Sequence, residues 1–99
     1  MMKDAQAKKA VEAVVKKLLG GENIRKIIVK PVDDYAGEPA LYVNIHWKRA
    51  DNLPSIERRS ELRDAVRQEL ANYEDGRFPY ISIVSSHWEK EAENERNSA

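Results

Sequence analysis

The alternation of apolar and polar residues from 41 to 48 constrains the fold of this chain most. The odd-numbered residues are all apolar: Leu41, Val43, Ile45 and Trp47. The even-numbered residues are mixed in character: Tyr42, Asn44, His46 and Lys48. A period of two places successive side chains on opposite faces of a strand. The segment therefore predicts a strand with one buried face, which needs neighbouring strands and an apolar layer packed against it.

Residues 4 to 19 have the other regular spacing, an apolar residue at every third or fourth position. These residues are Ala7, Ala10, Val11, Val14, Val15, Leu18 and Leu19. This spacing predicts an amphipathic helix, whose apolar stripe can supply such a layer. We expect Asp4 to cap its first turn, and Gly20 with Gly21 to provide the left-handed stop.

Three further segments complete the predicted order of elements. Residues 24 to 32 and residues 78 to 85 are rich in β-branched residues and predict two more strands. Between them, Asn52 or Ser55 begins a second helix that runs to about residue 73, with Gly76 as its stop. Its expected buried stripe consists of Leu62, Ala65, Val66, Leu70 and Tyr73.

Two amphipathic helices and three half-apolar strands predict an α+β two-layer sandwich in the order α-β-β-α-β. Both helices lie on one face of a three-stranded sheet in this arrangement, and the first two strands are antiparallel. The order resembles truncated ferredoxin-like folds and the type II KH topology, although the chain has no Gly-x-x-Gly loop. We expect residues 1–86 to form a single domain and residues 87–99 a short helical or disordered acidic tail.

Composition narrows the chemistry that is open to the chain. It has no cysteine, which excludes disulfides, thiolate metal sites and a thiol nucleophile. It has no apolar run of the length of a membrane span or signal peptide, so we expect a cytoplasmic protein without a membrane partner. A bacterial origin is a separate expectation, which no residue pattern supports. Lys and Arg balance Asp and Glu at 17 each, yet the first third is basic and the tail acidic. This polarity indicates either an electrostatically steered partner site or a solvated lysine face.

Residues with metal-binding or catalytic potential form no recognisable motif. His46 and His87 match no zinc pattern, and Asp33, Asp34 and Glu38 do not have the spacing of an EF-hand. Turn formation accounts for these acidic residues. We therefore predict no catalytic residue, metal or cofactor, with a metal-assisted hydrolase built on Asp33, Asp34 and His46 as the remaining enzymatic alternative.

The sheet face that two helices leave uncovered is the first candidate for function. Its candidate interface residues, with one from the tail, are Ile28, Tyr42, His46, Tyr80, Val84 and Trp88. Large exposed apolar patches mark protein interfaces, and tryptophan dominates their energetics. The same face is alternatively an ordinary solvated surface, or a stacking platform for single-stranded nucleic acid because its tyrosines lie among lysines.

A row of arginines on the second predicted helix is the other candidate. Arg59, Arg63 and Arg67 recur at every fourth position, and Asp64 is the one acidic residue three or four positions from any of them. Because a guanidinium group binds phosphate or carboxylate through two parallel hydrogen bonds, the row is a candidate anion-binding site. A solvated row paired with acidic groups from elsewhere is the alternative.

These features favour a non-enzymatic protein-interaction module. It acts either as a homodimer or other homo-oligomer, or as a small accessory partner of another protein, with an antitoxin-like role as one such case. The alternative is a nucleic-acid-binding domain that uses the basic first helix, the open sheet face and the arginine row.

Overall fold

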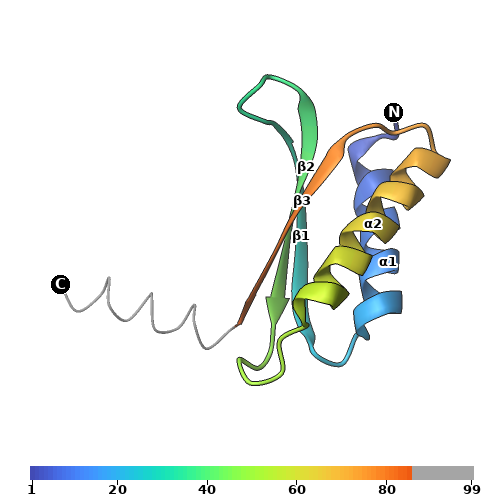
Figure 1. Ribbon diagram of the computed structural model, residues 1–99. Helices are drawn as coiled ribbons and strands as arrows, with labels where there is room; N and C mark the ends of the chain where they lie inside the picture. The colour runs from blue at the N-terminus through green and yellow to red at the C-terminus, as the bar shows by residue number, and fades with distance from the viewer. Residues whose placement is uncertain (86–99) are drawn as a thin grey trace.

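The structure, a computed structural model, describes residues 1–85. Its elements are α1 (Asp4–Leu19), β1 (Ile24–Asp33), β2 (Pro39–Trp47), α2 (Ile56–Asn72) and β3 (Phe78–Ser85). Both helices lie on one side of the sheet (Figure 1). The predicted two-layer α+β sandwich with the order α-β-β-α-β is confirmed, whereas the predicted tail of residues 87–99 lies outside the described residues.

The sheet has the order β1-β2-β3, which the sequence did not determine. β1 pairs antiparallel with β2, with a bulge between Ile24 and Lys26, and β3 pairs parallel with β2. Parallel neighbours need a long crossover connection, and α2 is that connection. Within residues 1–85, β1 and β3 are therefore the two edges of the sheet.

The core lies between the sheet and the helix layer. The apolar residues of β2 are buried against one stripe of residues from each helix. The residues of this core are Leu41, Val43, Ile45 and Trp47 of β2, Ala7, Val11 and Val15 of α1, and Leu62, Val66 and Leu70 of α2. Burial of each larger aliphatic side chain contributes about 1.5–3 kcal/mol. Trp47 is 3% exposed, and its indole nitrogen donates to Oδ1 of Asn52 at 2.7 Å. The period-two pattern thus predicted the buried face of β2 correctly.

The structure confirms the sequence prediction at the start of α2 but not at its end. Ser55 is the N-cap, and its hydroxyl accepts from the backbone N–H of Arg58 at 3.2 Å. At the other end, Tyr73 is 55% exposed, so its place in the predicted buried stripe is wrong. The left-handed residue is Glu74, with φ +56°, rather than Gly76. Glu74 closes the helix in a Schellman motif and adopts a left-handed backbone conformation, which is unfavourable for a residue other than glycine.

A buried arginine ties the connection between α2 and β3 to the start of α1. Arg77, 5% exposed, donates to the Asp75 carboxylate from Nε at 3.0 Å and from Nη2 at 2.7 Å. Its Nη1 donates to Oδ1 of Asp4 at 2.9 Å, and Nη2 reaches the carbonyl of Met2 at 3.3 Å. The predicted capping role of Asp4 is therefore wrong. Lys3 is the N-cap, without a side-chain cap, and the Asp4 carboxylate binds Arg77.

Replacing Arg77 by methionine should lower the free energy of unfolding by about 3–5 kcal/mol, because the Asp75 carboxylate would stay buried without its counterion. Urea unfolding followed by tryptophan fluorescence measures this loss. Arg49→Met is the matched control, since Arg49 pairs with Asp51 on the surface and both side chains are 65% exposed. The control should cost much less than Arg77→Met, and an equal loss in both variants would contradict the proposed role of Arg77.

Hydrogen bonds from Arg77 outweigh the effect of burial and hold the pKa of Asp75 below its ordinary value. A carboxyl group with a depressed folded-state pKa contributes stability above its unfolded pKa, about 3.9, and this contribution is lost as the pH falls through the folded pKa. The stability difference between the wild type and Asp75→Asn should therefore be full above about pH 5 and shrink below about pH 4. Urea unfolding across this range tests the prediction, and a difference that stays constant into acid would contradict it.

Candidate functional site

The sheet face opposite the helices carries its side chains in rows that cross the three strands. The rows are Lys30, Tyr42 and Tyr80; Ile28, Asn44 and Ser82; and Lys26, His46 and Val84. No helix or strand of residues 1–85 covers this face (Figure 1). The open face therefore has the residues that the alternation in the sequence predicted for it.

Hydrogen bonds between strands hold the polar side chains of this face. The Ser82 hydroxyl donates to Oδ1 of Asn44 at 3.1 Å, and the Tyr42 hydroxyl lies 3.5 Å from the same serine oxygen. The Tyr80 hydroxyl donates to Oδ2 of Asp34 at 3.3 Å. Partial burial, the Asp34 charge and this hydrogen bond raise the pKa of Tyr80. Each tyrosine hydroxyl group therefore has a hydrogen-bond partner within residues 1–85, and both of these contacts are exposed to solvent.

Three aromatic side chains gather where β3 begins, and we name them the aromatic end of the open face. Tyr42, Tyr80 and Phe78 are 40%, 39% and 36% exposed. The rings of Phe78 and Tyr80 pack at 4.8 Å between centroids with an angle of 56° between their planes. Sequence reasoning overlooked Phe78, although it shares the parity of Tyr80 along β3.

The other candidate interface residues are less accessible. Ile28 and Val84 are half-buried, and His46 is only 4% exposed. β2 is the central strand, so His46 has a neighbour on each side, Lys26 on β1 and Val84 on β3. The expectation that His46 is exposed on the open face is therefore wrong. Trp88, the sixth candidate, lies outside the described residues.

The acidic loop between β1 and β2 has a structural role that accounts for Asp34. Its Oδ1 accepts from the backbone N–H groups of Ala36 at 2.9 Å and Glu38 at 3.0 Å. His46 lies near the opposite end of β2, so the structure does not bring Asp33, Asp34 and His46 together as the hydrolase alternative requires. A search of residues 1–85 finds no cluster of three metal-ligating side chains.

The arginine row of α2, Arg59, Arg63 and Arg67, lies beside the same edge of the sheet as the aromatic end. The Arg67 guanidinium stands over the Phe78 ring, 5.2 Å from its centroid. Arg59 donates from Nε to a backbone carbonyl of the preceding loop at 3.1 Å, and Arg63 lies 3.7 Å from Asp64. Within the described part of the chain no other ion pair involves the row, so most of its positive charge is not neutralised by acidic side chains.

One groove of about 580 Å³ joins the aromatic end to the arginine row, and we name it the β3-edge groove. Arg59 and Arg63 line it on the helix side, and Tyr42, Phe78 and Tyr80 line it on the sheet side. The groove follows the outer edge of β3. Two candidate sites that are separate in the sequence thus form a single surface.

The two edges of the sheet differ in chemistry. β3 has no charged residue and no bulge, its one proline is its second residue, Pro79, and no strand of residues 1–85 pairs with its outer edge. β1 carries Lys26, Lys30 and Pro31, together with the bulge near Ile24. Lysines, prolines and bulges are the features that discourage strand pairing at an edge. β3 is therefore the edge that can accept another strand.

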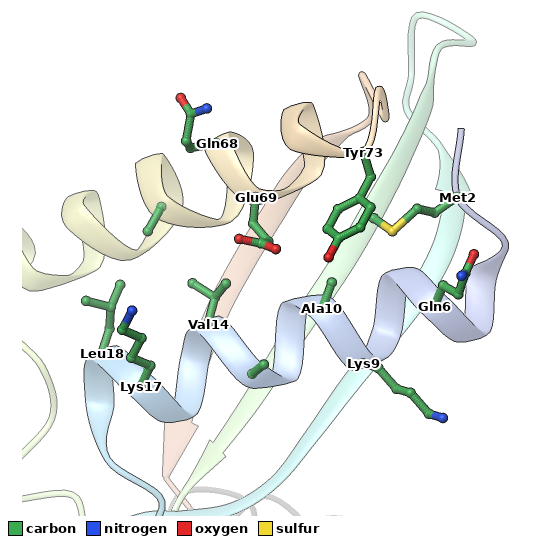
Figure 2. A pocket seen from close by; sticks show the side chains of 12 residues that line it. Met2, Gln6, Lys9, Ala10, Val14, Lys17, Leu18, Gln68, Glu69 and Tyr73 are labelled. Carbon is green, nitrogen blue, oxygen red and sulfur yellow. The ribbon is translucent and has the colours of Figure 1, made fainter.

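A second groove, of about 620 Å³, runs between α1 and α2 on the outer side of the helix layer. Figure 2 shows Tyr73 and Met2 over one end of this groove and Leu18 with Lys17 toward the other. Its floor is aliphatic, and its polar groups stand at the rim. None of the predicted candidate site residues lines it.

Comparison with protein-family models, with curated proteins and with solved structures gives no match to this chain. Neither helix of residues 1–85 is long and apolar enough to cross a membrane.

Proposed function

We propose that this chain is a non-enzymatic protein-interaction module and that the β3-edge groove, with the adjoining open face, is its contact surface. The observation that carries the proposal is the meeting of exposed aromatic side chains and largely unpaired arginines along an uncharged edge strand. Aromatic residues and arginine are the types enriched at the centre of protein interfaces.

The size of the open face supports a contact that extends onto the edge of β3. Three strands of this length cover an area of roughly 400 Å². Stable interfaces bury about 800 Å² on each partner, so the open face alone is too small. The β3 edge and the arginine row supply the additional area.

The mass of the purified protein in solution, measured by light scattering at two protein and two salt concentrations, tests the proposal. The absorbance of any co-purifying nucleic acid is recorded on the same sample. A nucleic-acid-free dimer supports a second copy as partner, and a nucleic-acid-free monomer supports a different protein. A monomer that carries nucleic acid removable by salt contradicts the proposal.

Replacing Tyr42 and Val84 together by lysine should leave the fold intact and abolish association with the partner, because two charges would be buried in the contact. Circular dichroism checks the fold, and light scattering or partner titration measures association. Tyr73→Lys is the matched control, since Tyr73 is exposed in the helix layer, away from the open face. Normal association of the double variant would show that the open face is not the contact surface.

Binding of single-stranded nucleic acid is the second candidate function. One observation favours it: arginines, which bind phosphate, and tyrosines, on which bases stack, line the same groove. Affinity for labelled single-stranded RNA, measured by fluorescence anisotropy, should then fall steeply with salt and weaken when Arg59, Arg63 and Arg67 become alanine. Lack of binding at low salt would remove this candidate.

A further inference from the structure

We infer that the partner contributes an extended segment, in which acidic and apolar residues alternate, as a fourth strand beside β3. The inference rests on the proposed function and specifies the chemistry of the partner. Its basis is an edge of the sheet, along residues 78–84, with which no strand of residues 1–85 pairs, and the different side chains on the two sides of that edge.

The backbone of β3 provides the first part of the recognition. β3 pairs with β2 on one side, and no strand of residues 1–85 pairs with the other side of residues 78–84. The N–H and C=O groups that these residues direct outward, apart from Pro79, which has no N–H, are therefore available to an added strand. Such strand addition gives affinity through main-chain hydrogen bonds and specificity through alternate side chains. β3 itself brings no charge that would oppose it.

The side chains around the edge determine the pattern of the incoming segment. Successive residues of an added strand point alternately toward the helix layer and toward the open face. Toward the helix layer they meet the arginine row, whose members are about 6 Å apart along the helix axis. Every second residue of a strand is spaced by about 6.6 Å, so an acidic residue at every second position matches the row. The intervening residues lie beside the open-face side chains of β3, which include the rings of Phe78 and Tyr80, and are apolar.

A second copy of this chain fits the edge poorly. Antiparallel pairing of two β3 strands about a twofold axis would keep both α2 helices on the same side of the joined sheet. The two arginine rows would then approach each other, and their like charges would repel. Pairing of β3 with the outer edge of β1 would meet Lys26, Lys30 and Pro31.

A nucleic acid would leave two features of the surface unused. A nucleic acid does not form β-sheet hydrogen bonds with the backbone of an edge strand. It also does not need an apolar contact on the α2 side of the groove. Ile56, which is 79% exposed, lines the groove next to the arginines. Its aliphatic side chain suits a peptide better than a phosphate backbone.

The test uses the full-length protein and a labelled peptide of about the length of β3 in which Glu and Val alternate. Fluorescence anisotropy should detect binding of this peptide. A control peptide in which all the Glu residues precede all the Val residues should bind at least about tenfold more weakly. A peptide of alternating Lys and Val should not bind. Amide hydrogen exchange followed by NMR should slow along Phe78–Ser85 and remain unchanged along β1.

Substitution of the arginines gives the matched comparison. Arg59→Ala combined with Arg63→Ala should weaken binding of the alternating peptide about tenfold. Arg58→Ala is the control, because Arg58 lies on the same helix but lines a different hollow beside Trp47. It should bind the peptide as the wild type does.

Several outcomes would overturn the inference. Equal binding of the alternating and blocked peptides, or no slowing of exchange along β3, would exclude strand addition. Displacement of the peptide by a single-stranded oligonucleotide that binds more tightly would assign the groove to nucleic acid. Binding that appears only after Glu89, Glu91, Glu93 and Glu95 become glutamine would assign it to the chain's own acidic tail.

The two proposals can fail separately. If strand addition fails while Tyr42→Lys with Val84→Lys still loses association with the partner, only the present inference is overturned. If that double variant also associates normally, the proposed function fails as well.

Discussion

The parallel pairing of β3 with β2 is the constraint on which the β3-edge groove depends. Parallel neighbours cannot be joined by a hairpin, so the chain must cross back over the sheet, and α2 makes that crossing. α2 therefore lies against β3 and on the same side of the sheet as α1 (Figure 1). This arrangement places the arginine row beside an edge strand and leaves the opposite face of the sheet without a helix.

A buried ion pair fixes the point at which β3 enters the sheet. Arg77 directly precedes the strand and is held both by Asp75, from the end of α2, and by Asp4, from the start of α1. Phe78 and Tyr80 of the aromatic end follow in the next residues of the chain. The Arg77 contacts therefore fix the position of one end of the β3-edge groove.

Patterns within short segments were sufficient to predict most of the architecture. Spacing of apolar residues predicted the order of elements and the buried face of β2, and capping preferences limited the start of α2 to Asn52 or Ser55, since each of these features depends on neighbours in the sequence. The low exposure of His46 could not be predicted this way, because the alternation along β2 assigns a side chain to one face of the sheet and does not determine how deeply it is buried there. The Arg77 contact with Asp4 joins residues 73 positions apart, and no local signal marks it. The proximity of the arginine row to the aromatic end could not be predicted either, because it depends on the strand order, which no local pattern determines.

The contrast between the two sheet edges also governs how far assembly can proceed. A domain with two receptive edges can stack head to tail without closing and grow into a filament. Here β1 has two lysines, a proline and a bulge, which discourage pairing at its outer edge, whereas β3 has no charged residue and no bulge. The sheet of residues 1–85 thus has one receptive edge. A copy that has accepted a strand at β3 has no second such edge through which further copies can add, and this asymmetry favours discrete complexes over open-ended polymers.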